Sequence, residues 1–488
     1  MTLSQKTAKL YKPNSRFDLL AWPVIGRLLR WRWGRLVFQL FLLLIAILVV
    51  YDGFTGRQLA PQNLATVSIW LEYRGIIVLV LLLAGNFFCM SCPFTLTRTL
   101  GRKLAGNGRK WPRALRTKWV AIAILITYFF LYEWLDLWAS PALTAWIVIG
   151  YFLLSFVLEL LFDSSPFCKY VCPLGSFNFA SATISPTQIK VRDRDICRTC
   201  VNKECINGNG DVLGCGTQLF APQIKSNMDC VFCLDCARAC PHENIGLFAR
   251  SPLEELKRDS WKKRWDVSFF MLVFAATALS NAFGMVPPVF AVLDWLGRLF
   301  GFATDGSVTV WEEGGMLLLI FGTLNVLLPV GVGLGISWLS RALAAGKART
   351  EPLRVVLARY VPSLVPLSFS IWVAHYGFHF ATGALSIIPV AQFFFADIGL
   401  PIFGEPNWML GPIMPLDWLL PLEIVVTVLG LGVSLYLVGE RSKLGNNGRP
   451  APVLVQLPWI LLLVLLAYTA VSLFGMPMEM RGTSFMGS

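Results

Sequence analysis

Four cysteines stand close together in the middle of the chain, between Cys230 and Pro241. They have the spacing C-x2-C-x2-C-x3-C-P and are Cys230, Cys233, Cys236 and Cys240. This spacing is typical of a [4Fe–4S] site, in which three thiolates of one tight loop bind one cubane and the fourth cysteine binds a neighbouring cluster. Cysteines this close in sequence do not easily form disulfides with one another. The stretch therefore predicts an iron–sulfur site.

A second set of cysteines lies upstream, with the spacing C-x2-C-x4-C-x9-C. Its members are Cys197, Cys200, Cys205 and Cys215. In chains with two such motifs, the last cysteine of each motif binds the other cluster. This exchange predicts one cluster on Cys230, Cys233, Cys236 and Cys215, and another on Cys197, Cys200, Cys205 and Cys240. A zinc ion on the upstream four cysteines is the alternative, because four thiolates are also a common zinc ligand set.

Two further cysteine pairs, each followed by proline, stand at the ends of apolar segments. They are Cys89 and Cys92 in FFCMSCPF, and Cys168 and Cys172 in PFCKYVCPLG. We expect both pairs at the same side of two successive helical hairpins, which would then form a repeated unit. The four thiolates would hold a third metal centre or relay electrons as dithiols. The alternative is that they pack the helix ends or dock a partner.

The composition indicates a multi-pass membrane protein. Of the 488 residues, 56% are hydrophobic and only 15% are charged, which is too apolar for a soluble domain. The formal net charge is +13, but the basic residues stand in short loops between apolar runs. That pattern is typical of cytoplasmic loops and does not favour nucleic-acid binding. The first apolar run begins near Leu36 without the features of a cleavable signal peptide, so we expect a retained anchor.

We expect an all-α polytopic membrane protein of about nine transmembrane helices, with a small α+β two-cluster domain inserted between them. The predicted spans are residues 35–51, 75–91, 119–138, 141–162, 266–286, 314–338, 360–383, 418–438 and 454–475. The predicted domains are a basic N-terminus (1–34), a four-helix membrane part (35–163), the cysteine-rich domain (164–262), a five-helix membrane part (263–475) and a Met-rich tail (476–488). A span needs about 20 apolar residues, which sets these limits.

The distribution of basic residues predicts the orientation. Loops 93–118, 339–359 and 439–452 are rich in Lys and Arg, whereas the opposite side carries only Arg57, Arg74, Arg298 and Arg481. We therefore expect the N-terminus and the cysteine-rich domain in the cytoplasm and the C-terminus outside. The apolar stretch 361–403 is about twice as long as a span. The charge rule favours one crossing followed by an interfacial piece near 387–403, and residues 291–302 predict a second interfacial helix.

Two histidines in an apolar span form a second candidate site, because polar groups are expensive inside a membrane. His375 and His379 are one helical turn apart, and Glu423 lies in the next span. One hypothesis is a quinol site, in which imidazole and carboxylate accept protons. Others are a haem b ligated with Met409 or Met414, and a copper site. For copper, the tail offers Met476, Met478, Met480 and Met486. The alternative is that the histidines only hydrogen-bond neighbouring helices.

Together, these cysteine motifs resemble those of the membrane-bound polyferredoxins of the NapH, NosR and CcoG type. That family combines C-x3-C-P motifs at span ends with a cytoplasmic two-cluster ferredoxin domain, and the resemblance covers roughly residues 35–250. Two departures stand out: the first pair here is C-x2-C-P, and five predicted spans follow the cysteine-rich segment. The resemblance implies two [4Fe–4S] clusters and electron transfer, but it does not identify the acceptor.

These observations predict an electron carrier of the bacterial inner membrane. Its clusters would take electrons from a soluble donor or from quinol and pass them to a membrane or extracytoplasmic redox partner. The basic loops would attract an acidic ferredoxin or flavodoxin. Two alternatives stay open. The resemblance to CcoG favours a factor that reduces or handles copper during assembly of a respiratory metalloenzyme, and the clusters would also suit a redox sensor.

Overall fold

The structure is a computed structural model that describes residues 18–31, 33–105, 108–210, 212–259, 261–302 and 308–478. These residues are mostly helical, with one two-stranded sheet. Within them, eight helical segments are long and apolar enough to cross a membrane. They are Gly34–Thr55, Leu64–Ala84, Pro141–Leu161, Trp265–Phe283, Val310–Ala342, Leu353–Asp397, Leu416–Gly445 and Val453–Phe474. The expectation of a helical, multi-pass membrane protein is confirmed at this level.

The second spanning segment lies earlier in the chain than the sequence predicts. It begins at α4 (Leu64–Thr66), where the side chain of Asn63 caps the helix by accepting a hydrogen bond from the Ala65 amide. It continues through the π-helix η4 (Val67–Tyr73) into α5 (Arg74–Ala84). Gly85, at φ +79°, ends it. Hydropathy alone missed this start because Glu72 and Arg74 lower the average. Arg74, expected in a loop, therefore lies inside an apolar helix.

The predicted span 119–138 is shorter in the structure. It corresponds to α8 (Trp119–Trp134), which has 16 residues and is therefore about 24 Å long. The hydrocarbon core of a bilayer is about 30 Å thick, so α8 falls short of the length of the other spans. It is a short apolar helix rather than one of the eight long segments.

The long apolar stretch after residue 353 consists of three helices in succession. They are α19 (Leu353–Tyr360), α20 (Leu364–Gly383) and α21 (Ile387–Asp397). Gly383, at φ −131°, interrupts the helical path between the last two. With 11 residues, α21 is too short to span a bilayer, as expected of an interfacial piece. The second predicted interfacial segment is helical too, as α16 (Pro287–Phe300), which has Pro287 at its first position and ends at Gly301 in the left-handed conformation.

The contacts divide the chain into two compact units. Unit 1 comprises Met1–Ile47, Leu79–Arg116 and Ile149–Glu255, and unit 2 comprises Leu48–Val78, Thr117–Val148 and Leu256–Ser488. All twelve cysteines belong to unit 1. The predicted boundaries at 164 and 262 differ from this division, because unit 1 joins the cysteine-rich segment to parts of the membrane helices that precede it.

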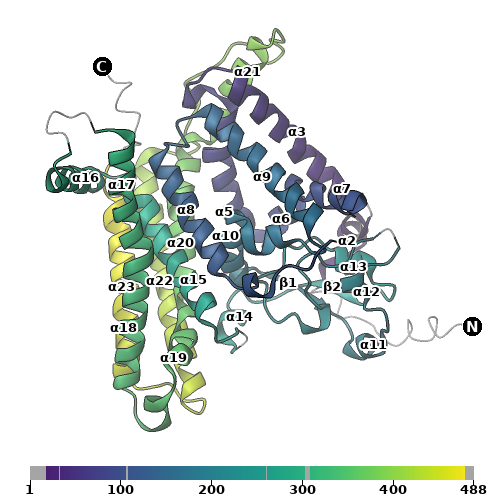
Figure 1. Ribbon diagram of the computed structural model, residues 1–488, viewed down its shortest axis with the longest axis vertical. Coiled ribbons are helices and arrows are strands. Elements are labelled where there is room, and N and C mark those ends of the chain that lie inside the picture. Colours follow the sequence, from purple (N-terminus) through teal and green to yellow (C-terminus); the bar gives the residue numbers. More distant parts are fainter. Residues whose placement is uncertain are drawn as a thin grey trace, which may run out of the picture. The chain divides into compact units, whose positions relative to one another are not determined.

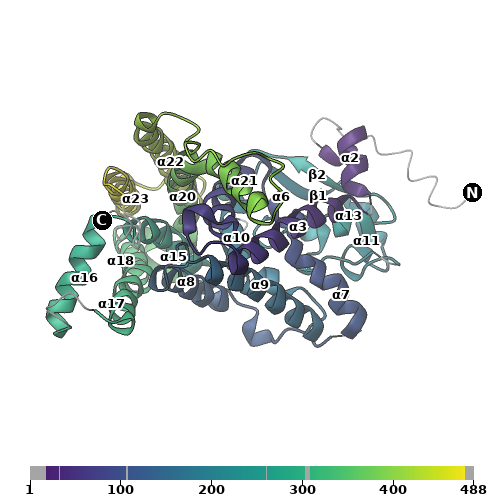
Figure 2. The same cartoon turned by 90° about the horizontal axis from the view of Figure 1, so that it is seen from above.

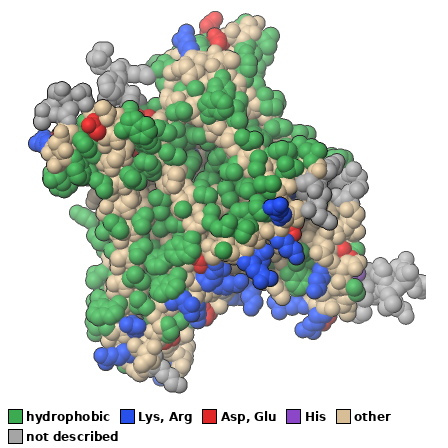
Figure 3. All heavy atoms as spheres, viewed as in Figure 1, with side chains coloured by type: hydrophobic (Ala, Val, Ile, Leu, Met, Phe, Trp, Pro, Cys, Tyr) green, Lys and Arg blue, Asp and Glu red, His purple; other side chains and the backbone are tan. Residues whose placement is uncertain are grey.

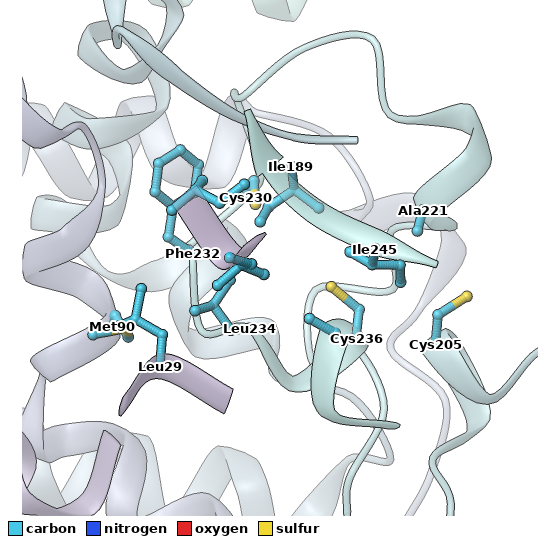
Figure 4. Close-up of a cluster of buried hydrophobic side chains, with 13 residues drawn as sticks. Leu29, Met90, Ile189, Cys205, Ala221, Cys230, Phe232, Leu234, Cys236 and Ile245 are labelled. Atoms are coloured by element: carbon cyan, nitrogen blue, oxygen red, sulfur yellow. The ribbon is translucent and has the colours of Figure 1, made fainter. Parts of the chain in front are cut away.

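The core of unit 1 forms around the small sheet (Figure 4). Strand β1 (Thr187–Val191) pairs antiparallel with β2 (Ile245–Ala249). Phe232 and Leu234, from the cysteine-rich loop, pack in the same cluster as Met90, from the first C-P motif. The N-terminal segment joins them through Asp18, which is fully buried, ion-pairs with Arg192 and accepts a hydrogen bond from the backbone of β2. The sheet and the cysteine loops thus share one apolar core.

Unit 2 is a helix bundle, in which α15 (Trp265–Phe283), α18 (Leu328–Ala342), α20, α22 (Leu419–Ser442) and α23 (Val453–Phe474) pack side by side (Figures 1 and 2). The closest pair is α20 with α22. A Cβ added at Gly430 would lie only 2.0 Å from the Ser370 hydroxyl oxygen, and Ser434 accepts a hydrogen bond of 3.0 Å from the Leu367 amide. Small residues allow this close approach.

Candidate functional site

The eight cysteines of the cysteine-rich segment fall into two groups in space. The first group lines one cavity and consists of Cys197, Cys200, Cys205 and Cys240. The second group lies within mutual electrostatic range and consists of Cys215, Cys230, Cys233 and Cys236. The last cysteine of each sequence motif thus lies with the first three of the other motif. This is the grouping that the exchange pattern requires. His242, which is exposed, also lines the cavity of the first group.

The backbone around both groups contains several non-glycine residues in the left-handed conformation. In the described part of the chain, seven non-glycine residues have positive φ, and five of them lie between 203 and 243: Lys203, Gln218, Phe232, Leu234 and Glu243. Such a conformation costs about 1–3 kcal/mol for a non-glycine residue and is concentrated at functional sites. Alternation of left-handed and ordinary residues turns successive backbone N–H groups toward one side, which favours an anion there.

Several cysteine sulfurs accept hydrogen bonds from amides. Cys215 accepts one from the Leu219 backbone at 3.3 Å, and Cys197 accepts one from the Asn244 side chain at 3.2 Å. Hydrogen bonds to sulfur are one of the means by which a protein sets the potential of an iron–sulfur cluster. The sequence offered no signal for Asn244, because an asparagine three residues after a cysteine motif is common in turns.

Three arginines converge on one buried carboxylate beside the second group. Asp235 lies between Cys233 and Cys236 in sequence and ion-pairs with Arg35, Arg98 and Arg238 at 3.3, 3.1 and 2.6 Å. Burial would raise the pKa of Asp235, but these guanidinium groups hold it below its ordinary value. Three positive charges face one negative charge here. The excess suits a [4Fe–4S] cluster, because four thiolates leave its net charge negative in both oxidation states.

The thiols of the second group are poorly placed to ionise alone. Burial, followed by the neighbouring Asp235 carboxylate, raises the pKa of Cys233 to about 12. Burial also raises the pKa of Cys230 and Cys236, and the neighbouring cysteines add to the effect. A bound metal reverses this balance, because a coordinated thiol is deprotonated. Iron would therefore make thiolates stable in a place where free thiolates are not.

The two C-P motifs have the same local structure and form a third group: Cys89, Cys92, Cys168 and Cys172. Cys92 (φ −61°, ψ 122°) precedes the short helix Pro93–Thr95, and Cys172 (φ −62°, ψ 120°) precedes α10 (Pro173–Ser181). Each of these cysteines is thus a helix N-cap followed by proline. Burial raises the pKa of Cys168, and Cys172, Cys92 and Cys89 lie close enough to add to it. Asn178 donates a 2.8 Å hydrogen bond to Cys89. The second cysteine of each pair therefore has the same backbone conformation, and the four thiols lie within electrostatic range of one another.

Arg35 connects the third group to the second. Its guanidinium donates hydrogen bonds to the Met90 carbonyl at 3.1 Å and to the Thr95 hydroxyl at 2.6 Å, both in the first C-P motif. It also pairs with Asp235, and it lies within electrostatic range of Cys233, Cys168 and Cys92. Asn86 adds a second link by donating a 2.7 Å hydrogen bond to the Cys230 carbonyl. One charged side chain thus bonds to residues beside both cysteine groups.

In the described residues, no three His, Cys, Asp or Glu side chains converge closely enough to hold a single metal ion. A tetrahedral zinc site with Zn–S bonds of about 2.3 Å needs its sulfurs roughly 4 Å apart. This finding therefore does not favour the zinc alternative. A cubane places four irons between its thiolates, so the cysteines of a cluster site lie farther apart.

The predicted histidine site lies in unit 2. His375 is fully buried and neither of its ring nitrogens has a hydrogen-bond partner; Nε2 of His379 has none either. The two rings are 4.9 Å apart. Arg74 lies within electrostatic range of both. Its guanidinium packs against the rings of Trp70, Tyr132 and Tyr376, at 4.5, 4.4 and 5.1 Å from their centres. The site is thus two imidazoles beside a buried arginine.

Glu423 belongs to a different face of the bundle. It shares a buried stripe of α22 with Thr427 and Gly430, and Gly430 contacts Ser370 on α20. A helix turns about 100° per residue, so His375 and His379 lie on the side of α20 away from Ser370. The sequence grouped Glu423 with the histidines; the structure groups Arg74 with them. A charged residue inside a membrane span is itself an indication of function. The sequence predicts the second span too late in the chain, and it therefore places Arg74 in a loop and not in this site.

Met409, one of the methionines proposed as a partner of the histidines, lies at the surface. Met409 is 91% exposed, whereas His375 is fully buried. Met480 and Met486 of the tail lie outside the described residues. The haem and copper hypotheses, which need a methionine beside a histidine, therefore stay predictions.

No protein-family model matches the chain, and neither a curated protein nor a solved structure matches it. The resemblance to membrane-bound polyferredoxins stays a prediction, and function has to be argued from the residues. Among these, Asp235 was visible in the sequence as the acidic residue inside the cysteine motif. Arg35 and Arg98 were not, because they stand about 200 and 140 residues from their partner.

Proposed function

We propose that this chain is a membrane-bound electron carrier with two [4Fe–4S] clusters in unit 1. The observation that carries the proposal is the position of Cys215 and Cys240, each of which lies with the other motif's cysteines. The excess of arginine around the second group and the strained backbone between the cysteines also support it. Transfer of single electrons between such clusters needs no catalytic side chain, so the protein's part is to hold, tune and shield them.

Iron counting with paired variants tests this proposal. Anaerobically purified protein is expected to contain about eight irons and eight acid-labile sulfides per chain if only the two clusters form. Cys240→Ser and Cys197→Ser remove ligands of the same cluster, so each variant and the double variant should retain about four irons. Cys240→Ser combined with Cys215→Ser should retain almost none. Protein that is colourless, or that holds zinc alone, would rule the proposal out.

We propose that the third group extends this relay as a redox dithiol set or a third metal centre. Its support is the mutual approach of four thiols from two equivalent motifs and their connection to the second group through Arg35. A third cubane would raise the iron content to about twelve per chain. Cys89→Ser with Cys172→Ser would bring it back to about eight. If the unmodified protein and the Cys89→Ser/Cys172→Ser variant both contain about eight irons, the third group holds no cluster. Thiol trapping after reduction and after oxidation then distinguishes redox-active dithiols from thiols that only pack the helix ends.

We propose nine crossings, with the cysteines on the cytoplasmic side of a bacterial inner membrane. The third group supplies the reason. Its two cysteine pairs follow the second and fourth predicted spans and lie together, so an even number of crossings must separate them. Among the described residues between the pairs, α8 and α9 (Pro141–Leu161) are the apolar helices, since α7 (Leu96–Ala105) is short and rich in basic residues. Because α9 is long enough to span, we propose that the shorter α8 spans as well.

We propose quinol as the electron donor, at His375 and His379 with Arg74. Oxidation of one quinol releases two electrons and two protons; two imidazoles can accept the protons, and two one-electron clusters can accept the electrons. The support is the pair of neighbouring imidazoles, in which both ring nitrogens of His375 and Nε2 of His379 lack hydrogen-bond partners. His375→Gln and His379→Gln should slow cluster reduction by quinol at least tenfold without changing reduction by dithionite. Glu423→Gln is the control, and an equal effect of Glu423→Gln would contradict this site.

The basic loops support a second source of electrons, an acidic ferredoxin or flavodoxin. The chain carries a formal charge of +13, and attraction between opposite charges raises association rates in a salt-dependent way. Reduction of the clusters by such a protein should therefore slow as ionic strength rises, while reduction by quinol should not.

A further inference from the structure

A polar cavity of about 180 Å³ lies at one end of the unit 2 bundle. It is enclosed by the end of α18, by α19, by the end of α22 and by the start of α23. Its polar lining residues are Ser340, Arg341, Arg359, Ser442 and Asn446, and none of its lining residues is acidic. The cavity is thus positively charged and lies where helices end, at the depth of lipid headgroups rather than of lipid tails.

Two of the lining side chains lack a partner. Ser340 is 1% exposed, and its hydroxyl has no hydrogen-bond partner. Arg359 is ion-paired with Glu351, whereas Arg341 has no ion pair with any described residue. A buried hydroxyl without a partner is unfavourable, because it has lost its hydrogen bonds to water. A ligand that accepts hydrogen bonds from Ser340 and Arg341 would remove this cost.

The start of α23 adds to the positive character of the cavity. Pro452 and Val455 line it. Pro452 caps this 22-residue helix without a side-chain hydrogen bond, although the Val455 amide donates a 3.0 Å hydrogen bond to the Pro452 carbonyl. The first N–H groups of a helix have no partners within the helix and carry a partial positive charge. Phosphate groups commonly bind there. Three features therefore favour an anion in this cavity: a free arginine, a free hydroxyl and an uncapped helix N-terminus.

A second, apolar cavity of about 400 Å³ lies farther along the same helices. It is lined by α15, α18, α20 and α23, and nearly all of its lining is hydrocarbon. Leu364 lines this cavity and Tyr360 lines the polar one; they are one helical turn apart, about 6 Å. The two cavities thus lie along one seam, formed by α18, α23 and the stretch from α19 into α20. Going inward from the helix ends, the cationic cavity comes first and the apolar cavity second.

We propose that this seam binds an anionic phospholipid, with its phosphate in the polar cavity and an acyl chain in the apolar cavity. The order of the two cavities decides the occupant, because a free phosphate would leave the apolar cavity unfilled. Basic pockets between membrane helices are known to suit anionic headgroups. Figure 3 shows Lys and Arg side chains at the lower ends of α18 and α19, beneath the hydrophobic sides of the bundle.

Native mass spectrometry of the full-length, delipidated protein tests the proposal with four probes: phosphatidylglycerol, phosphatidylcholine, glycerol phosphate and inorganic phosphate. We expect one phosphatidylglycerol per chain, bound at least tenfold more tightly than the other three. Arg341→Gln should weaken that binding about tenfold, the effect of losing one charge-assisted hydrogen bond. Arg349→Gln is the matched control, because Arg349 is exposed in the short helix that follows α18 and the substitution removes the same charge. It should leave binding unchanged.

The apolar cavity is tested with Ala276→Leu, which fills part of it from α15. We expect weaker binding of long-chain phosphatidylglycerol and unchanged binding of glycerol phosphate. Equal retention of phosphatidylcholine, or equal effects of Arg341→Gln and Arg349→Gln, would overturn the proposal. If inorganic phosphate binds as tightly as the lipid, the cavity is a small-anion site and the lipid proposal is wrong. None of these outcomes depends on the iron–sulfur clusters.

Discussion

Asp235 holds three arginines beside the second cysteine group, and its own charge therefore affects both stability and redox potential. It is buried, and its carboxylate is the only acidic partner that the structure gives to Arg35 and Arg98 among the described residues. Removing one member of a buried ion network typically costs about 3–5 kcal/mol, because the remaining charges stay buried and unpaired. Removing a negative charge also stabilises the reduced, more negative form of a nearby cluster.

We therefore predict that Asp235→Asn lowers the free energy of unfolding by about 3 kcal/mol and raises the potential of the neighbouring cluster by tens of millivolts. Thermal unfolding and redox titration followed by EPR measure the two effects. Asp195→Asn is the matched control, since Asp195 lies in the same domain and pairs with Arg198 at the surface. It should change neither quantity appreciably. A lower potential in Asp235→Asn would contradict the proposed position of the cluster.

At the scale of the elements, the packing of α20 against α22 depends on one glycine. A Cβ at position 430 would lie 2.0 Å from the Ser370 hydroxyl and 2.6 Å from its Cβ, whereas a Cβ at Gly432, on the same helix, would meet nothing within 4 Å. We predict that Gly430→Ala lowers the melting temperature in detergent, with a cost of about 1–3 kcal/mol from overpacking. Gly432→Ala should be neutral or slightly stabilising, because alanine favours a helix over glycine. Equal melting temperatures would show that the two helices do not approach this closely.

The elements also show what the sequence can and cannot determine. The grouping of Cys215 with Cys230 was predictable because short loops restrict which thiols can meet, and cysteine spacing records those loops. The start of the second span was not, because hydropathy averages polar Glu72 and Arg74 with their apolar neighbours. The side of α20 that carries His375 was visible from helical periodicity, but its partner was not. Whether Arg74 or Glu423 faces it depends on which helix packs there, and that is decided by contacts distant in sequence.

At the scale of the whole molecule, the number of crossings determines where the termini lie. Among the described residues, eight segments are long enough to span, and an even number would place both termini on the same side. The ninth crossing that we propose, by α8, would put them on opposite sides. A helix of 16 residues can cross if the bilayer thins locally or flanking side chains extend to the interface, at a cost of fractions of a kcal/mol per ångström of mismatch. Trp119, the first residue of α8, is 48% exposed and is suited to such anchoring.

We predict that alkaline phosphatase inserted into the full chain before α8, near residue 112, is inactive, because the proposed orientation places that loop in the cytoplasm and the enzyme matures only outside. The same insertion after α8, near residue 140, should be active, as should a fusion after residue 478. The two insertions differ only by α8, so each controls for the other. Equal activities before and after α8 would mean that it does not cross. The two cysteine pairs would then lie on opposite sides of the membrane, and the third group, on which the proposed relay depends, could not form.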